Sequence, residues 1–474
     1  MSVAIGTPAG GGRPRHGAVS PGPHLQGLTQ PPTMAVRVTS TNADQLDQPL
    51  SPLIARLRCL TCGGTLRLEE VAPEPAYPDL GPDGVLVCED CDERYPIIGG
   101  TARMLDRQGR ARLSDDYPLA SGVLDPVENA AHPLSDEARV KQQTADSFSY
   151  EWQRFGDPRS EWQKNFEGYL QPHSVGFLRG RSILDIGAGS GRHSAQAAEH
   201  GAEVVAVDLG RSIDVARRNL PPQVLTVQAD AERLPFEHRS FDFVMAIGVL
   251  HHLPDPMRAL RSVVPFAAPG GRVHVYLYWV PEQRVHRELL KLVTAARLLT
   301  VRLPHSVLHA ACYPLSLLLY GTIVACHRAL RHRPRGGAIA ALLPLKIYAD
   351  YPFTVLVNDQ FDRFSAPLEQ RYTRHQVKTM LEQAGLEDIQ VLPNSGWVGD
   401  GRAPEQLAPL GPPSRVSVIV TVRNDRPGLE ELLPALAAQE TVPDELIVVD
   451  GGSVDDTLDA FTHFGDAPFP VQRN

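Results

Sequence analysis

The sequence has few cysteines and no excess of positive charge. Six cysteines among 474 residues are too few for a disulfide-stabilised secreted domain. A net charge of −9 argues against a surface built to bind nucleic acid, and we expect no nucleic-acid partner. Hydrophobic residues make up 42% of the chain and charged residues 21%, which is typical of a soluble globular protein. The length is enough for about three domains.

The first fifty residues lack an apolar run long enough for a signal peptide. They begin MSVAIGTPAGGGRPRHG and are rich in glycine and proline. Such a segment buries too little apolar surface to offset the entropy of folding. We therefore predict that residues 1–50 are a disordered tail and that the protein is cytoplasmic.

Four of the six cysteines form two CxxC pairs. Cys59 and Cys62 make the first pair, Cys88 and Cys91 make the second, and 25 residues separate the pairs. Two thiolate pairs on neighbouring turns supply four sulfur ligands, which suit a structural zinc ion with no open coordination position. Alternating apolar residues around the pairs predict short strands. A redox role for one pair, or four unrelated buried cysteines, would be the alternative.

The segment around these cysteines resembles a known module. CLTCGGTLRLEE and VLVCEDCDERYPIIGGTARML are similar to the small zinc ribbon that serves as an activator subunit of RNA and protein methyltransferases and is fused to many bacterial methyltransferases. We place this ribbon at residues 51–110. The resemblance implies a docking and stabilising role.

Further along, the stretch LDIGAGSGRH predicts a strand, a tight turn and a helix. Gly187, Gly189 and Gly191 alternate after Asp185, whereas a dinucleotide-binding fingerprint would have its third glycine where Arg192 stands. Glycines let the backbone approach a ligand closely, and the helix that follows directs its free N–H groups at that ligand. The pattern therefore predicts a nucleotide-type site of another class.

More strands that end in polar residues follow this loop. AEVVAVDL ends in Asp208, VLTVQAD ends in Asp230, and FDFVMAIGVLHHLPDP runs into a turn with two histidines. Alternation of strands and helices predicts a parallel, doubly wound α/β sheet that binds its ligand along the carboxyl edge. A carboxylate at Asp208 can accept both ribose hydroxyls, and one at Asp230 can accept the adenine amino group. A Rossmann-like domain without this ligand is the alternative.

These motifs, in this order, resemble class I S-adenosylmethionine-dependent methyltransferases, in particular the type 11 group that includes ubiquinone and menaquinone methylases. The resemblance runs from Phe148 to Arg402, within a domain that we place at residues 140–402. It implies a Rossmann-like, seven-stranded sheet, and an aromatic segment, SFSYEW at Ser147–Trp152, that closes over the cofactor. It implies that S-adenosylmethionine is bound by Asp185, Gly187, Gly189, Gly191, Asp208, Leu209, Asp230 and Ala231.

The catalytic residues are less determined. S-adenosylmethionine is a strong methyl donor, so correct placement of the acceptor could suffice. A general base helps if the acceptor is a hydroxyl, and His251 and His252 lie where the acceptor is expected. We name both as catalytic candidates, with packing as their alternative role. Asp255 and Tyr278 are further candidates.

A long apolar insertion at about residues 285–349 interrupts the methyltransferase pattern. Residues 306–326 contain no charged side chain, and four arginines follow at Arg328, Arg331, Arg333 and Arg335. We expect a helical lid over an apolar acceptor pocket, with peripheral contact at the inner face of the membrane and a membrane span as alternatives. We further expect Cys312 and Cys326 to be small buried residues, the arginines to meet anionic headgroups, and the acceptor pocket to be bordered by Asp359, Asp362 and Trp397.

The C-terminal part has another composition. After a linker at residues 403–414, residues 415–474 resemble the start of a family-two glycosyltransferase of the A-type fold. Asp450, Ser453, Asp455 and Thr457 match its nucleotide-sugar turn, and Gly451 replaces an aspartate. Because no DxD-type metal pair occurs in this segment, we expect a truncated module.

The leading functional prediction is a methyltransferase for a small, partly apolar or glycan- or lipid-linked acceptor. A non-catalytic scaffold built around the zinc ribbon is one alternative. A glycosyltransferase–methyltransferase fusion in cell-envelope glycan synthesis is another. The sequence sets no oligomeric state.

Overall fold

The computed structural model describes residues 54–120 (without 73), 135–157, 161–281, 283–333, 337, 340, 343, 345–405, 417–437, 445–457 and 471–473. The chain divides into two units, residues 1–45 and 46–474, and all described residues belong to the second. The predicted tail at residues 1–50 and most of the predicted linker lie outside the described residues.

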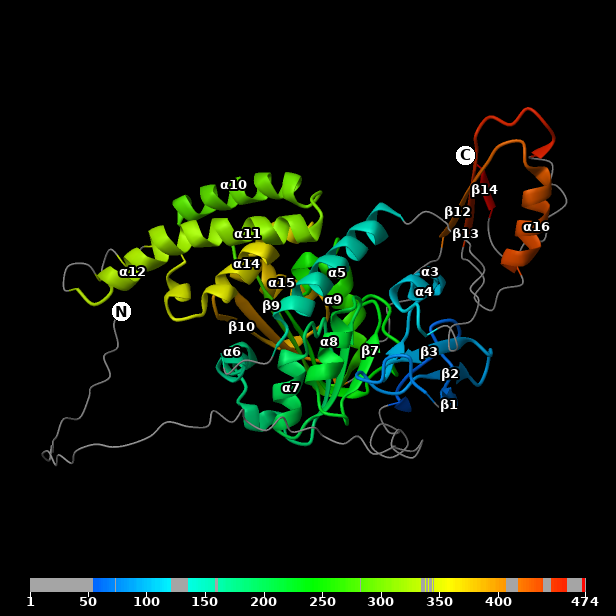
Figure 1. Cartoon of the computed structure of the whole chain (residues 1–474). Coiled ribbons are helices and arrows are strands. Elements are labelled where there is room, and N and C mark those ends of the chain that lie inside the picture. Colours follow the sequence, from blue (N-terminus) through cyan, green and yellow to red (C-terminus); the bar gives the residue numbers. More distant parts are fainter. Residues whose placement is uncertain are drawn as a thin grey trace, which may run out of the picture. The chain divides into compact units, whose positions relative to one another are not determined.

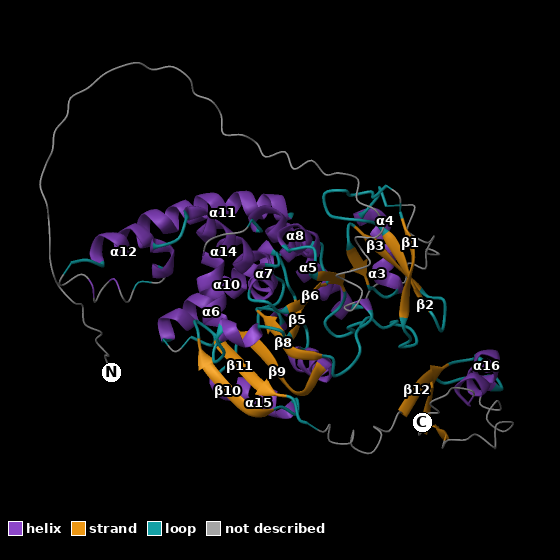
Figure 2. Cartoon of the chain, turned by 90° about the horizontal axis from the view of Figure 1, so that it is seen from below, coloured by secondary structure: helices purple, strands orange, loops and turns teal. Residues whose placement is uncertain are grey.

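Seven strands form the predicted methyltransferase-like sheet. Their order is β7 (Leu225–Gln228), β6 (Glu203–Asp208), β5 (Ser182–Ile186), β8 (Phe241–Ile247), β9 (Ala267–Leu277), β11 (Trp397–Arg402) and β10 (Glu387–Pro393). The first five run parallel, and β11 is inserted antiparallel between β9 and β10. Figure 2 shows these strands from below, with β10 at one edge of the sheet. The strand order reverses between β5 and β8, which is where doubly wound sheets bind ligands.

Both faces of this sheet are buried, as its nearly continuous apolar strands require. Alternate residues of β5 enter different cores: Leu184 packs on one face and Ile183 on the other. The helices that follow the strands are α7 (Arg192–Glu199), α8 (Ser212–Asn219), α9 (Pro256–Val263) and α15 (Arg374–Gln383). The sheet is therefore a rigid platform, and its carboxyl edge is left for a site.

The cysteine-containing segment continues the same sheet. Strands β1 (Leu66–Val71), β2 (Gly84–Cys88), β3 (Arg94–Ile98) and β4 (Thr101–Arg103) form an antiparallel meander, and β4 pairs in parallel with β7. The result is one sheet of eleven strands. Two short helices, α3 (Arg107–Ala111) and α4 (Leu113–Asp116), follow. The ribbon is thus hydrogen-bonded to the edge of the larger sheet.

Two groups of helices lie over the carboxyl edge (Figure 1). The first is α5 (Asp136–Phe155), which starts at an N-cap made by the Ser135 hydroxyl, and α6 (Glu161–Leu170). The second is the predicted helical insertion, with α10 (Arg284–Thr300), α11 (His305–Leu319), a π-helical turn (Tyr320–Val324), α12 (Ala325–Leu330) and a 3₁₀ turn (Lys346–Ala349). The next helix, α14 (Phe353–Ser365), follows the predicted insertion and packs against both α11 and α5.

The C-terminal segment has its own small parallel sheet. Strands β12 (Ser417–Val422), β13 (Glu445–Asp450) and β14 (Val471–Arg473) lie in that order, and α16 (Arg426–Ala437) connects the first two. Leu429 and Leu433 of α16 are buried against this sheet. The segment contains a βαβ unit.

Candidate active site and metal centre

The glycine turn after β5 admits no side chains. Gly187, Gly189 and Gly191 have φ angles of 69°, 57° and 79°. A Cβ atom on Gly189 would lie 2.8 Å from Nε1 of Trp152, and one on Gly187 would lie 2.3 Å from Cγ2 of Val249. The turn is therefore packed directly beneath α5, as a closely approached backbone requires.

Asp208, at the end of β6, faces this turn. Its carboxylate accepts hydrogen bonds from the backbone N–H groups of Gly189 and Gly210, both at 2.9 Å. Burial raises its pKa, and hydrogen bonds from Ser212, Gly210 and Gly189 oppose that rise. The carboxylate has further acceptor capacity toward the cavity that it lines.

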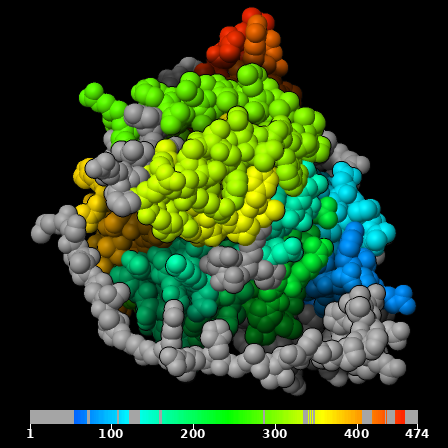
Figure 3. Space-filling view, turned by 60° about the vertical axis from the view of Figure 1, so that its left-hand side comes forward, coloured from blue at the N-terminus to red at the C-terminus, as the bar shows by residue number. Residues whose placement is uncertain are grey.

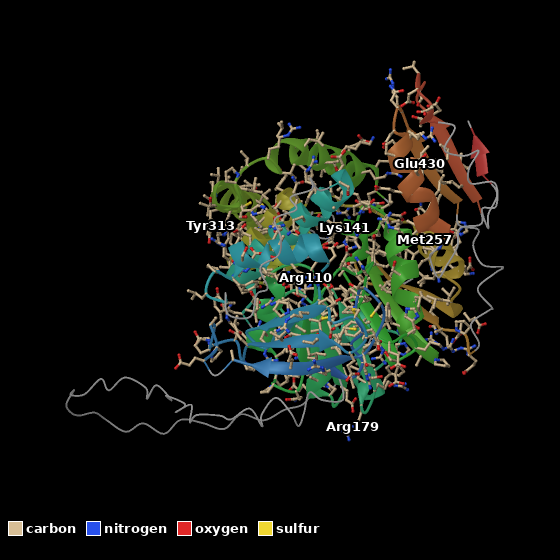
Figure 4. The ribbon with its side chains drawn as sticks, turned by 90° about the vertical axis from the view of Figure 1, so that its right-hand side faces the viewer. Arg110, Lys141, Arg179, Met257, Tyr313 and Glu430 are labelled. Carbon is tan, nitrogen blue, oxygen red and sulfur yellow. The ribbon has the colours of Figure 1, made fainter. Side chains whose placement is uncertain are left out.

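A cavity of about 590 Å³ lies above the carboxyl edge. It brings together most of the residues predicted to bind the cofactor: Gly187, Gly189, Asp208, Leu209, Asp230 and Ala231. Phe148 and Trp152 of the predicted aromatic segment line it as well. Lys141 of α5 (labelled in Figure 4) donates to the carboxylates of Asp230, at 3.0 Å, and Glu232, at 2.8 Å.

Two predicted cofactor residues do not line the cavity. Asp185 is 1% exposed and accepts a hydrogen bond from the Ser194 hydroxyl at 2.6 Å, which ties β5 to the start of α7. Burial raises the pKa of Asp185 to about 7. Gly191 is the N-cap of α7 and packs against Leu220 and Ala216. Both residues hold the turn in place from behind.

The two histidines differ in position. His252 lines the cavity, and its Nδ1 donates to the Leu368 carbonyl at 2.7 Å. His251 is fully buried, is absent from the cavity lining, and stacks on Tyr278 with ring centroids 4.0 Å apart. Burial lowers the pKa of His252 to about 4 and that of His251 well below its ordinary range. Both are therefore neutral at physiological pH, and His252 is only a weak base.

Of the other residues predicted to lie near the acceptor, some line the cavity and some do not. Tyr278, Asp359 and Asp362 line the cavity. Asp255 instead caps α9, accepting from the backbone N–H groups of Met257 and Arg258. Trp397 lies outside the lining, and its Nε1 donates to the Tyr372 carbonyl at 2.9 Å.

Sequence reasoning missed Glu151, which joins the predicted Asp359 and Asp362 in an acidic cluster in the cavity wall. Glu151 of α5 is 3% exposed; one carboxylate oxygen accepts from the Asn358 amide at 2.9 Å, and the other has no hydrogen-bond partner among the described residues. Asp359 and Asp362 project from α14 beside it, and the Tyr348 hydroxyl donates to Asp359. The sequence around Glu151 gave no signal that this residue belongs to the site, because its partner, Asn358, lies 207 residues away in the chain.

The environment of these carboxyl groups disfavours their charged form. Burial raises the pKa of Glu151 well above its ordinary value, and the charge of Asp362 adds to this. Burial, with repulsion from Asp359 and Glu369, raises the pKa of Asp362 to about 7. A carboxyl group with a pKa near 7, such as that of Asp362, can exchange a proton near neutral pH.

The lid prediction needs correction. Among the described residues of the predicted insertion at 285–349, only Tyr348 lines the cavity, and α14 completes the wall. Leu292, Leu299 and Leu317 of α10 and α11 are exposed, and the buried Leu308 and Cys312 of α11 pack against α14. The cysteine prediction is half wrong: Cys312 is buried, but Cys326 is exposed on α12, because α12 lies at the outer end of the insertion.

The four paired cysteines converge as predicted. Their Sγ atoms all lie within 4.8 Å of one another, and Cys62 approaches Cys91 at 3.3 Å and Cys88 at 3.4 Å. Ligand sulfurs in a tetrahedral zinc site are about 3.8 Å apart. The donor set and its spacing therefore fit a closed, four-sulfur metal centre.

A second group, His173, His274 and Asp400, also comes within ligand distance. Here Arg272 donates to the Asp400 carboxylate at 2.9 Å, and both histidines bond to the same group. These partners hold the pKa of Asp400 well below its usual range despite burial. Because its charge is already compensated, we regard this cluster as structural.

Comparison with known families agrees with this geometry. Residues 184–275 match the methyltransferase domain family, and residues 417–472 match glycosyl transferase family 2. The chain thus contains a methyltransferase domain and a glycosyltransferase-like segment, as the sequence motifs predicted.

Curated relatives carry the same domain. A ubiquinone biosynthesis O-methyltransferase from Coxiella burnetii is 36% identical over 100 residues, which are 20% of this chain and 43% of that protein. One from Idiomarina loihiensis is 31% identical over 153 residues, which are 29% of this chain and 61% of that protein. The chain therefore spans less than two thirds of the relatives it matches.

Solved structures of methyltransferases are similar to the chain over a larger part. The 1,6-didemethyltoxoflavin-N1-methyltransferase of Burkholderia thailandensis covers 58% of this chain and 93% of its own, with 15% identity and a TM-score of 0.34. Human N-acetylserotonin methyltransferase covers 62% of this chain and 66% of its own, with 14% identity and a TM-score of 0.34.

Proposed function

We propose that this chain is an S-adenosylmethionine-dependent methyltransferase that acts on a small-molecule acceptor in the cytoplasm. The observation that carries the proposal is the shared cavity: the glycine turn, Asp208 and the Asp230–Ala231 pair line a single space at the switch point of the sheet. These residues lie within the matched methyltransferase domain.

The chemical character of the residues that line the cavity suits S-adenosylmethionine. Asp208 would accept the ribose hydroxyls, Asp230 and Ala231 would contact the adenine, and the turn at Gly187 and Gly189 would receive the methionine moiety. Bound S-adenosylmethionine supplies an electrophilic methyl group. Lys141, which now bridges Asp230 and Glu232, neutralises the adenine end of the cavity.

The acceptor would occupy the opposite part of the cavity. This part is lined by Tyr276 of β9, by Tyr278 just after that strand, and by the acidic cluster of α5 and α14. Because His252 is a weak base, we assign proton removal from the acceptor to the carboxyl group of Asp362, whose pKa burial raises to about 7. His251 would support Tyr278 by packing.

The wall chemistry favours an acceptor with substantial apolar surface. Aromatic side chains line the cavity together with the carboxyl groups: Phe148, Trp152, Phe155, Trp162, Tyr169 and Tyr351. An aromatic or lipid-linked molecule bearing a hydroxyl or amino group would match both features. We further propose zinc as the ion of the four-cysteine centre, with a structural role.

The test is calorimetric titration of the zinc-loaded protein with S-adenosylhomocysteine, followed by mass spectrometry of ligands that co-purify. We expect saturable binding with one site per chain. Absence of binding by a folded, zinc-loaded chain would leave the scaffold alternative in its place.

A further inference from the structure

We propose that the outward face of α10 and α11 binds the surface of an anionic lipid bilayer. We call this surface the lipid-docking face and define it by nine exposed apolar residues: Leu289, Leu292, Leu298, Leu299, Leu303, Val307, Tyr313, Leu317 and Leu318. Figure 3 shows α10 and α11 in yellow-green on the surface of the molecule.

Exposed apolar side chains are concentrated on this face. Thirteen large hydrophobic residues are exposed in the described part of the chain, and nine of them lie between Leu289 and Leu318. Leu292, Leu299 and Leu317 are 66–69% exposed. Single exposed leucines are ordinary, but a contiguous group of this kind marks an interaction surface.

The pattern of α11 explains why these residues are not core. Leu308, Cys312 and Ser316 form one buried stripe with a spacing of four residues, and Leu308 and Cys312 pack against Val357 and Phe361 of α14. A surface helix usually places polar residues opposite such a stripe. In α11 the rest of the circumference is uncharged from residue 306 to residue 326.

The charge of the segment complements an anionic surface. Residues 284–333 contain eight lysines and arginines and a single acid, Glu288, although the whole chain has a net charge of −9. Arg287 and Lys291 are exposed beside Leu289 and Leu292, and Arg302 is exposed beside Leu303. Apolar residues flanked by basic ones are typical of helices that lie in the bilayer interface.

Two of the four arginines predicted to meet headgroups have partners within the protein instead. Arg328 donates to the Ala349 carbonyl at 2.8 Å, and Arg331 pairs with Asp350 at 2.7 Å. Both therefore hold the insertion together. Arg333 is exposed, as headgroup contact would require, and Arg335 lies outside the described residues. The case for headgroup contact therefore rests on Arg333 together with α10 and the turn after it.

Two other occupants fit these observations less well. A second copy of the chain would bring the same positive charges together across a symmetric contact. The helical stretch His305–Leu330 is long and apolar enough to cross a membrane, and 22% of its most apolar 18-residue part is buried inside the protein. Crossing would require α11 to leave α14 and expose Phe361, which is fully buried now.

The position of α14 connects this face with the acceptor cavity. Val357 and Phe361 pack toward α11, while Asn358, Asp359 and Asp362 line the cavity. One helix therefore separates the lipid-docking face from the acceptor wall. Delivery of a lipid-borne acceptor along this route rests on the proposed function, whereas lipid binding itself does not.

The experiment is flotation of the full-length, zinc-loaded chain with two kinds of vesicle: phosphatidylcholine alone, and phosphatidylcholine with about one third phosphatidylglycerol. We expect binding to the anionic vesicles that weakens with added salt and is reversed by alkaline carbonate. The double variant Leu299→Asp/Leu317→Asp should lose about tenfold or more in vesicle affinity. Leu119→Asp, at an equally exposed leucine (68%) outside the insertion, is the matched control.

A charge variant tests the basic contribution. Arg287→Glu/Lys291→Glu should lower binding to anionic vesicles, whereas Arg179→Glu should not. Arg179 (labelled in Figure 4) is exposed just before β5, at the amino edge of the sheet, and α14 covers the carboxyl edge.

Several results would overturn the proposal. One is absence of vesicle binding, and another is equal loss in Leu119→Asp. Resistance to carbonate would indicate a membrane span instead. Self-association would be indicated by two results together. The parent chain would form a dimer in sedimentation equilibrium without binding vesicles, and Leu299→Asp/Leu317→Asp would be a monomer. Calorimetry with S-adenosylhomocysteine on the same double variant separates this outcome from failure of the proposed function, because we expect unchanged cofactor affinity.

Discussion

Arg103, the last residue of β4, donates a hydrogen bond to Asp214 of α8 across 2.8 Å, and the two side chains are 0% and 5% exposed. The Tyr117 hydroxyl donates to the other Asp214 oxygen at 2.9 Å. Because α8 follows Asp208 in the chain, this buried ion pair fastens the ribbon to the helix beside the proposed ribose site.

Breaking this pair should destabilise the domain. Removal of one partner of a buried ion pair costs about 3–5 kcal/mol, and Asp214 would be left with the Tyr117 hydroxyl and Arg211, at 3.6 Å, as weaker partners. We expect Arg103→Ala to lower the free energy of unfolding in urea by that amount. Arg139→Ala, which removes an exposed pair with Asp136, should change it by less than about 0.5 kcal/mol. Equal effects of the two substitutions would contradict this interpretation.

The metal centre should be required for folding of the ribbon. The free energy of binding a structural zinc ion is folding free energy. We expect one zinc per chain by elemental analysis, and a lower soluble yield for Cys88→Ser. Cys326→Ser, at an exposed cysteine of α12, should keep the metal content of the parent chain. Less than half a zinc per freshly purified chain would refute the assignment.

Asp208 should determine cofactor affinity. Hydrogen bonds to a charged acceptor are worth about 1.5–3 kcal/mol each. Asp208→Ala should therefore weaken S-adenosylmethionine binding at least tenfold in calorimetry. Asp146→Ala, on the outer side of α5, serves as the control. Thermal unfolding of both variants checks that the turn at Gly189 is intact, and unchanged affinity would mean that the cofactor lies elsewhere.

Asp362 should make stability fall as pH rises. Its folded pKa of about 7 exceeds the ordinary value of about 3.9, so the folded state binds more protons between these two pH values. This contribution is present below about pH 4 and is lost as pH rises to about 7. Asp362→Asn should flatten the melting temperature between pH 5 and pH 8, compared with the parent chain and with Asp146→Asn. A variant profile that still follows the parent chain would show that Asp362 is not the group responsible.

The sequence by itself determined the local elements and the kind of site. Alternating glycines after an apolar run required the turn at Gly187–Gly191, and acids at strand ends placed Asp208 and Asp230 at one edge, because parallel strands share their carboxyl edge. The spacing of the four cysteines determined that they could meet. Each of these inferences depends on backbone geometry within a few residues or on sheet topology.

Only the tertiary structure decided which side chains share a space. It moved Asp185, Gly191 and His251 behind the cavity wall, and it brought Glu151 to Asn358 from a helix 207 residues earlier in the chain. It paired β4 with β7 and turned the leucines of α10 and α11 away from the site. The direction in which a helix presents each face depends on the partner that it packs against, and sequence periodicity defines the faces without naming that partner.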